Sequence, residues 1–329
     1  MIFATTNKLA APTHSERDAI AALPRNVAAH DAHLAALPCM TAIEVGNNRP
    51  AAPLTFPLTI AAWNLERCMF PAASAAKIAA TGAQVVVLSE MDNGMARTAQ
   101  AHTTAEVAGA LAMSYAYGVE FIELGLGSET ELEFCTDSHN TNGFHGNAIL
   151  AATALVRPFL LRLPGQRFWF LEGGDQPRLG ERIAIGALIQ TEAGPIVMVS
   201  THLESNADAP QRAAQMRILI DALDANFPDL PLLIGGDLNT GNHIGGDWRD
   251  ETLFDHARGL GFGIHGGPEA AMTTRPSLIT RWPDRAMKLD WFLTRGLQVA
   301  ASHIIASLDQ AGTPLSDHDM IVLEISAMA

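Results

Sequence analysis

Cysteine is scarce in this sequence, and the residues that occur are too few and too far apart to organise a fold. Cys39, Cys68 and Cys135 are odd in number and widely spaced, which fits neither a disulfide framework nor a zinc cluster. The N-terminus lacks a basic flank followed by an apolar stretch, and no apolar run is long enough to cross a bilayer. We therefore expect a soluble protein without a transmembrane segment in the reducing environment of the cytoplasm.

Basic residues are also in short supply. The chain has 21 Lys and Arg residues against 35 Asp and Glu residues, which gives a formal net charge of -14 with histidine neutral. Such a surface repels polyanions on average, although a local basic groove or a bound divalent cation can reverse the potential at one site. The net charge therefore disfavours nucleic acid as a partner without excluding it.

Several catalytic signatures are absent: the Walker sequence of P-loop proteins, the G-x-S-x-G of serine hydrolases and the H-E-x-x-H of zincins. The segment 261–266 matches G-x-G-x-x-G, but Gly267 and Pro268 follow where a helix should begin. We interpret this segment as a loop. Those enzyme classes and dinucleotide binding have no support in the sequence.

The chain divides into two parts of different composition. Residues 1–52 contain a helical pattern that opens at Ser15 and is interrupted at Pro24, followed by a linker-like stretch at 47–50. From residue 53 to 329, short apolar runs rich in β-forming residues alternate with helical patterns and turn residues. We predict an N-terminal helical appendage and linker at 1–52 and one α/β domain at 53–329.

The apolar runs predict a series of strands, and the first two end in polar residues. Asn64 ends the run at 58–64, and Glu90 ends the run at 85–90. A long amphipathic helix is predicted at 211–226. Further strands are predicted at 115–124, 147–151, 182–190, 195–201, 231–236, 289–294, 297–305 and 318–326.

Polar residues recur where these strands end, and their types belong together. Asn64, Glu90, His202, Asp237 and His318 each stand at or near such an end, where rigid backbone aims side chains at a shared site. Carboxylate and amide oxygens suit a hard cation such as Mg²⁺ or Mn²⁺, with Ca²⁺ as an alternative, and histidines beside carboxylates suit proton transfer. The combination predicts metal-assisted attack of water on phosphorus.

Seven short segments of the chain resemble, in order and spacing, the endonuclease/exonuclease/phosphatase superfamily. The resemblance implies a four-layer αββα sandwich of two mixed sheets flanked by helices, with a metal site at one edge. The segments are Trp63–Glu66, Ser89-Glu90, Gly146–Leu150, Ser200–Leu203, Gly236–Asn239, Leu289–Trp291 and Ser316–His318.

The resemblance also implies roles at the metal. Glu90 resembles the family's principal metal ligand, with Asn64 beside it, and Asp317 resembles a ligand that acts directly or through water. Glu66 matches only some branches of the family, and we keep two interpretations, a second carboxylate at the metal or a salt-bridge partner. Ala151 and the residue after it stand where many members have Ser-Arg, so one expected local contact is absent.

The remaining matches imply catalytic roles. Asp237 resembles the residue that positions or deprotonates the attacking water, and Asn239 one that contacts phosphate. His318 resembles the required histidine near the scissile phosphate, and Asp290 the carboxylate that fixes its tautomer. His202 resembles a second histidine that supports the phosphate or the leaving group.

Substrate contacts are predicted at four further residues. Asn147 is expected at the floor of the site, and Arg97, Arg178 and Arg182 in segments that resemble those of small bacterial members, where an arginine can fork onto a phosphate. For these arginines, solvated charge or a structural ion pair is an equally good interpretation. The aromatic run 168–170 predicts an apolar wall or, more simply, a buried hairpin.

These observations lead to three functional hypotheses. The first is a phosphodiesterase or phosphatase acting on a small organic phosphate or a lipid headgroup. The second is an endonuclease or exonuclease acting on DNA or RNA, and the third is a non-catalytic binding protein. A nuclease would need a basic face built from Arg162, Arg167, Arg275, Arg281 and Arg285, of which the last three, with Lys288, also predict an anion-attracting rim before Asp290.

Overall fold

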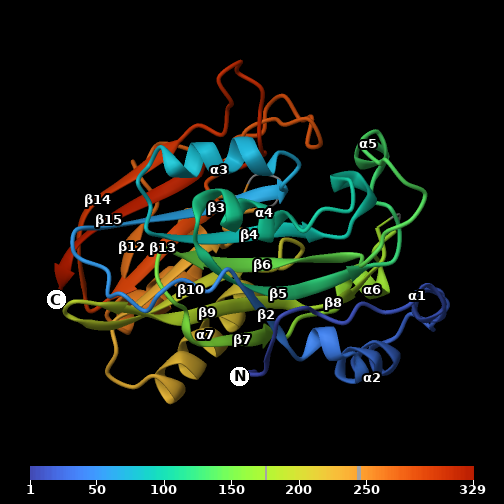
Figure 1. The fold of residues 1–329 in the computed structure, drawn as a ribbon, viewed down its shortest axis with the longest axis horizontal. Helices are drawn as coiled ribbons and strands as arrows, with labels where there is room; N and C mark the ends of the chain where they lie inside the picture. The colour runs from blue at the N-terminus through green and yellow to red at the C-terminus, as the bar shows by residue number, and fades with distance from the viewer. Residues whose placement is uncertain (175, 243–245) are drawn as a thin grey trace.

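Two β-sheets pack face to face in the computed structural model, which describes residues 1–174, 176–242 and 246–329 (Figure 1). Helices cover the outer faces of both sheets, so the chain has four layers. The sheets are mixed, since β3 pairs parallel with β4 whereas β4 pairs antiparallel with β6. This confirms the predicted α/β sandwich. Among the described residues, no helix combines the length and apolar composition that crossing a membrane requires.

The larger sheet has the strand order β1-β2-β5-β6-β4-β3-β15-β14, with β8 paired to β5. Its strands are β1 (Thr5–Thr6), β2 (Ile43–Gly46), β3 (Leu58–Arg67), β4 (Val85–Asn93), β5 (Ser114–Glu123), β6 (Phe144–Ala151), β8 (Arg178–Gly180), β14 (Leu297–Ile305) and β15 (Met320–Met328).

The smaller sheet has the order β12-β13-β11-β10-β9-β7. Its strands are β7 (Val156–Leu163), β9 (Arg182–Thr191), β10 (Gly194–His202), β11 (Leu232–Asp237), β12 (Gly263–His265) and β13 (Asp290–Arg295). The helices are α1 (His14–Ala21), α2 (Val27–Ala36), α3 (Pro71–Ala79), α4 (Thr103–Leu111), α5 (Glu129–Leu132), α6 (Phe168–Leu171), α7 (Ala209–Asn226) and α8 (Thr252–Gly259).

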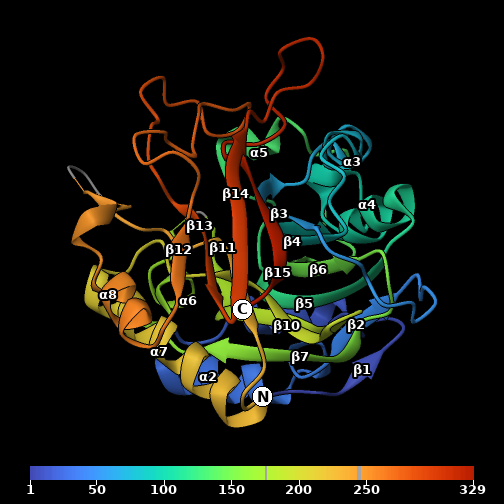
Figure 2. The same ribbon diagram turned by 90° about the vertical axis from the view of Figure 1, so that its left-hand side faces the viewer.

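Alternation within the central strands explains the layers. In β4, Val86 and Leu88 pack with α3 and α4, whereas Val85 and Val87 pack into the core between the sheets. Successive side chains of a strand point to opposite faces, so a strand buried on both faces must be apolar throughout. Figure 2 shows α3 and α4 on one side of the two sheets and α7 and α8 on the other.

The N-terminal segment is attached to the sandwich through backbone pairing. Thr13 caps α1 in a capping box with Glu16, which agrees with the helix predicted near Ser15. Strand β2 pairs antiparallel with β5 at the edge of the larger sheet, and Ile2 bridges to Leu160 of the smaller sheet. Residues 1–52 thus lie along both sheets, while their standing as a separate unit stays a prediction.

Two local expectations differ from the structure. The segment 261–266 contains strand β12, which pairs with β13 through Ile264 and Leu293, so its interpretation as a loop was wrong. Three of the six residues are glycine, which disfavours a strand in isolation, so the sequence does not predict the strand that forms by pairing with β13. The aromatic run at 168–170 forms the short helix α6, not a hairpin.

A glycine in the segment Gly146–Leu150 marks a close approach of two strands. A Cβ atom at Gly146 would lie 2.0 Å from the backbone oxygen of Gly118 on β5, so we expect Gly146→Ala to destabilise the fold by about 1–3 kcal/mol. Urea unfolding would measure this. Gly259→Ala is the matched control, because nothing lies within 4 Å of its new methyl group. Equal stability of the two variants would contradict this packing.

Candidate active site

Strands β3 and β4 both have irregular register near the positions of Asn64 and Glu90. These two polar residues lie close together in the larger sheet. The register of β3 against β4 slips between Asn64 and Arg67, and β4 slips against β6 between Leu88 and Met91. Glu66, Arg67 and Glu90 adopt φ angles of 43°, 78° and 56°, a left-handed backbone that is uncommon outside glycine. Such conformations persist where surrounding structure enforces them and are concentrated at functional sites.

Strands β10 and β11 of the smaller sheet end, and strand β13 begins, at the same place. His202 on β10 is in register with Asp237 on β11, and Asp237 is in register with Asp290 on β13. Neighbouring strands lie about 4.8 Å apart, so these three side chains are brought together by the sheet itself. All three are buried.

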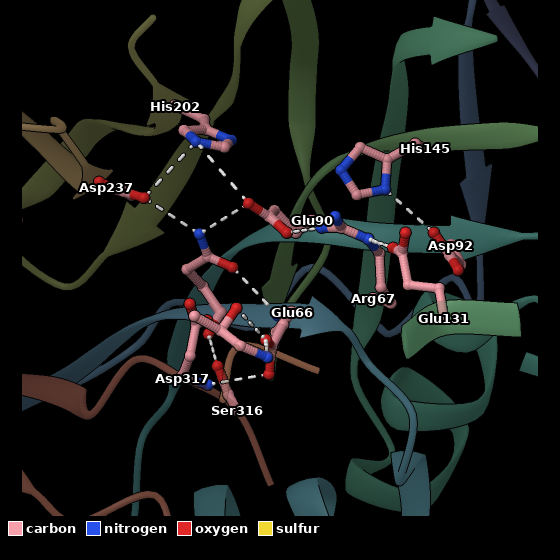
Figure 3. Close-up of polar contacts among 12 residues, drawn as sticks. Glu66, Arg67, Glu90, Asp92, Glu131, His145, His202, Asp237, Ser316 and Asp317 are labelled. Carbon is pink, nitrogen blue, oxygen red and sulfur yellow. Dashed lines mark hydrogen bonds and ion pairs between the residues drawn. The ribbon is translucent and has the colours of Figure 1, made fainter. Parts of the chain in front are cut away.

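Asn64 joins the two sheets at this point. Its Nδ2 donates to Glu90 Oε1 at 3.2 Å and to Asp237 Oδ2 at 3.0 Å. Asp237 Oδ2 also lies 3.5 Å from His202 Nε2 and 3.6 Å from His318 Nε2. The Asp237 carboxylate therefore contacts both His202 and His318. Figure 3 shows Asp237 beside His202, with Glu90 nearby.

His318 is held as a cation. Its Nδ1 lies 2.8 Å from Asp290 Oδ2, and Trp63 Nε1 donates to its backbone oxygen at 2.8 Å. Burial alone would lower the pKa of His318, but Asp290, Asp317 and Asp237 outweigh burial and raise it to about 10. Burial raises the pKa of Asp290 to about 6, against the opposing effect of His318. The pair can hold and deliver a proton.

His202 has the opposite character. Burial and then the charge of Arg182 lower its pKa well below the usual histidine value, and Arg182 Nη1 lies 2.9 Å from its Nδ1. Glu120 Oε2 lies 3.5 Å from the same nitrogen, a partner that sequence reasoning missed. The one available signal was a carboxylate in the middle of a predicted strand, between Val119 and Phe121 of β5. His202 is thus a neutral imidazole fixed by Arg182 and Glu120.

Glu66 points to a loop. Its Oε1 accepts from Ser277 Oγ at 2.7 Å and from Thr280 Oγ1 at 2.7 Å, and its Oε2 accepts from Asp317 N at 3.1 Å. Burial and then the charge of Asp317 raise its pKa to about 7. These contacts anchor the segment 277–280 beside Asp317. Glu66 has no salt bridge within the described residues, and a role for it at a metal stays a prediction.

Arg97 and Arg178 form buried ion pairs, and neither contacts His202 or His318 in the described part of the chain. Arg97 Nε is 2.8 Å from Asp92 Oδ2, and its side chain has no exposed area. Arg178 Nε is 3.0 Å from Glu123 Oε1, and its guanidinium lies 4.5 Å from the ring of Trp169. The structural interpretation fits both residues better than contact with substrate, whereas Arg182 does reach the site through His202.

Asn239 contacts the cluster directly, whereas Asn147 contacts the neighbouring strand β9. Asn147 Nδ2 donates to Ile183 O at 3.2 Å, and its Oδ1 is buried without a hydrogen-bond partner in the described part of the chain. Asn239 N donates to Asp237 Oδ1 at 2.8 Å, and its side chain donates to Leu203 O at 3.0 Å. Asn239 therefore orients Asp237 through its backbone.

Arg67 and Glu131 are neighbours of Glu90 that sequence reasoning also missed. Arg67 Nη1 contacts the Glu90 carboxylate, and its Nε donates to Glu131 Oε1 at 2.6 Å (Figure 3). Glu131 comes from α5, 64 residues along the chain from Arg67. Nothing local in the sequence pairs these residues, because their contact depends on how the loop after β5 folds back.

The donor set fits a hard divalent cation. Glu90 and Asp317 offer carboxylate oxygens, and Asn64 turns its Nδ2 to Glu90 and Asp237 and its Oδ1 to the backbone N–H of Glu66. One donor atom each from Asp237, Asp290 and His318 lies within 4.8 Å of the others. Asp290 Oδ1 is buried and has no hydrogen-bond partner among the described residues. Oxygen-rich sites of this kind bind Mg²⁺, Mn²⁺ or Ca²⁺ in preference to softer metals.

Comparison with solved structures finds the same fold. An endonuclease/exonuclease/phosphatase from Beutenbergia cavernae aligns with a TM-score of 0.58 and 20% identity over 83% of this chain and 72% of that chain. The human Nocturnin catalytic domain aligns with 0.55 and 18% over 87% and 97%. Bacteroides thetaiotaomicron mannosyl-6-phosphatase aligns with 0.54 and 14% over 82% and 99%.

No curated protein matches the chain in sequence. The model of the Endonuclease/Exonuclease/phosphatase family, in contrast, matches residues 61–318. The matched range begins in β3, before Asn64, and ends at His318, so it contains all the strand-end residues described above. The chain therefore belongs to the endonuclease/exonuclease/phosphatase family.

Proposed function

We propose that this protein is a divalent-metal-dependent phosphodiesterase or phosphatase that acts on a small organic phosphate or a lipid headgroup, with water as the nucleophile. Members of its family are hydrolases of phosphoesters. The observation that carries the proposal is the carboxylate of Asp237 between a neutral His202 and a charged His318. In this set Asp237 can accept a proton and His318 can donate one, and the two groups lie 3.6 Å apart.

Asp237, His318 and His202 have different roles in the proposed hydrolysis. Asp237 accepts a proton from water, whose oxygen attacks phosphorus. His318, kept protonated by Asp290, donates a proton to the departing alkoxide. His202 donates a hydrogen bond to a phosphoryl oxygen, with its ring held by Arg182 and Glu120. Water and ester are thereby converted to an alcohol and a phosphate.

A divalent cation, Mg²⁺ or Mn²⁺, would be held by the carboxylates of Glu90 and Asp317, with Asn64 beside Glu90 as the residue that orients it. When bound, it supplies neutralisation of the charge that develops on the phosphoryl oxygens. Glu66 is not required in this set, because its oxygens are engaged with Ser277, Thr280 and the backbone of Asp317.

Charge favours a small substrate over a nucleic acid. The net charge is -14, and each arginine that a nuclease would need for a basic face is engaged with an oxygen of the protein. Arg162 donates to Met40 O and Val119 O, and the other four pair with carboxylates: Arg167 with Asp31, Arg275 with Asp319, Arg281 with Glu133 and Arg285 with Asp317. The fold similarity to a mannosyl-6-phosphatase is compatible with such a substrate.

The first test is a panel of chromogenic phosphomonoesters and phosphodiesters beside plasmid nicking, after chelation and after addition of Mg²⁺ or Mn²⁺. We expect turnover of small esters that chelation removes and the metal restores, without nicking. Nicking that outpaces turnover of every small ester, with steep salt dependence, would identify a nuclease instead.

Glu90→Gln tests the metal ligands within the same assay. The amide keeps the shape of the side chain but loses its charge, so we expect the metal concentration for half-maximal activity to rise by about 10-fold or more. Glu106→Gln, on the outer helix α4, is the matched control. A metal titration identical to that of the wild type would remove Glu90 from the set of ligands.

A further inference from the structure

Glu90, a metal ligand in the proposed function, is already paired with a cation of the protein itself. Arg67 Nη1 contacts its Oε2. His202 Nε2 lies 4.0 Å from the other oxygen, but that ring is neutral. Within residues 1–174, 176–242 and 246–329, no other Lys or Arg side chain lies within 4.0 Å of this carboxylate. A divalent cation that binds Glu90 must therefore share the carboxylate with Arg67 or displace it.

Arg67 has a second carboxylate partner. Its Nε donates to Glu131 Oε1 at 2.6 Å, and the Glu131 side chain has no exposed area. Ser128 N and Gln176 Nε2 donate to Glu131 Oε2 at 2.6 and 2.9 Å, so this carboxylate is fixed in place. Figure 3 shows Arg67 between Glu90 and Glu131. The guanidinium therefore keeps one partner when Glu90 is engaged by another cation.

The ion pairs around Arg67 balance without Glu90. They join Arg67 to two further arginines and three carboxylates through contacts of 2.6–3.2 Å, and these members are Arg97, Arg178, Asp92, Glu123 and Glu131. His145 contacts Asp92 but is neutral, because burial and then the charge of Arg67 lower its pKa well below the usual histidine value. Three arginines thus face three carboxylates. A cation that takes over Glu90 leaves no arginine of this group without a counter-charge.

Glu90 needs a neutralising charge of its own when no metal is bound. Asn64 Nδ2 donates to Glu90 Oε1 at 3.2 Å and to Asp237 Oδ2 at 3.0 Å, so one amide group holds two carboxylates close together. Like charges this close repel each other, and the repulsion is strong where water is largely excluded. Arg67 supplies the charge that offsets this repulsion at Glu90.

We propose that Arg67 is a built-in competitor of the metal: it neutralises Glu90 when no metal is bound, and Glu131 retains it when a divalent cation takes Glu90; this inference rests on the proposed function. Arg67 then sets the metal affinity without touching the substrate. Removing its charge should tighten metal binding. Removing the charge of Glu131 should weaken metal binding, because an arginine without Glu131 pairs with Glu90 alone. A purely structural role predicts that neither change tightens binding.

Mn²⁺ binding to the full-length, chelator-treated protein tests these two signs. Electron paramagnetic resonance measures free Mn²⁺, so the result does not depend on turnover. We expect Arg67→Met to lower the dissociation constant for Mn²⁺ by about 10-fold and Glu131→Gln to raise it by about 10-fold, since a unit charge a few ångströms from a divalent cation has at least this effect near a protein surface. The matched controls are exposed: Arg258→Met on α8 and Glu129→Gln on α5.

Two further variants separate charge from folding. Arg67→Lys keeps a positive charge at this position, so its Mn²⁺ affinity should stay close to that of the wild type. The double variant Arg67→Met with Glu131→Gln removes one charge of each sign, so the remaining ion pairs still balance and the protein should fold even if a single variant does not. It should bind Mn²⁺ more tightly than the wild type. Urea unfolding in the presence of chelator shows which variants fold.

The outcomes separate the inference from the proposed function. Wild-type or weaker Mn²⁺ affinity in Arg67→Met, or in the double variant where the single variant does not fold, would overturn the competition, and so would unchanged or tighter binding in Glu131→Gln. If the wild type binds Mn²⁺ but hydrolyses no ester, the proposed function fails, and the order of the affinities still decides the inference. A wild type that binds neither Mn²⁺ nor Mg²⁺ would overturn both.

Discussion

Replacing His318 with alanine should lower kcat by about 10²- to 10⁴-fold, the usual contribution of a positioned acid or base. The physical reason is the ion pair with Asp290, at 2.8 Å between Nδ1 and Oδ2, which keeps the imidazole protonated and aimed at Asp237. Alanine leaves no group in reach that can protonate the leaving alkoxide. Single-turnover measurement of the chemical step on an activated and an unactivated ester would show the larger loss with the poorer leaving group.

The control for this variant is His303→Ala, because His303 lies on β14 with 55% of its side chain exposed. Asp290→Asn should act in the same direction, and the double variant should lose little more than His318→Ala alone, since the two residues act as a unit. Urea unfolding separates lost chemistry from lost stability. Retention of more than about a tenth of the wild-type rate would remove His318 from the role of acid.

The strand ends were the predictable part of this site. His202 and Asp237 follow apolar runs, and strands β10 and β11 are parallel neighbours in register, so the pattern of each run places its last residue beside the other. The same logic places Asn64 close to Glu90 on β3 and β4. Regular strands can be read from local sequence because burial on both faces demands apolar residues throughout.

The contacts around these ends could not be predicted. Glu120 lies inside a strand, and its partner Arg182 is 62 residues away. The left-handed backbone at Glu66 and Arg67 leaves no signature in sequence, because glycine is absent there and tertiary contacts enforce the conformation. The sequence around Arg97 resembles a solvated loop. Only the packing of Asp92 and Glu123 around the Arg97 side chain places it in a buried ion pair.

Asp237 is the residue whose loss should be hardest to compensate. Its Oδ2 faces Asn64, His202 and His318, while Oδ1 is fixed by the backbone N–H of Asn239 at 2.8 Å. Asparagine has the same shape but cannot accept a proton from water, so we expect Asp237→Asn to lower kcat by about 10²- to 10⁴-fold. Asp221→Asn, exposed on α7, controls for the loss of charge.

A metal titration then tells a base from a ligand. If Glu90 binds the cation and Asp237 accepts the proton, added metal should recover activity in Glu90→Gln but not in Asp237→Asn. The distinction matters because Asp237, Asp290 and His318 lie close enough together to hold a cation themselves. Recovery of Asp237→Asn at high metal concentration would make Asp237 a ligand, and the proton from water would then have to pass to a group other than Asp237.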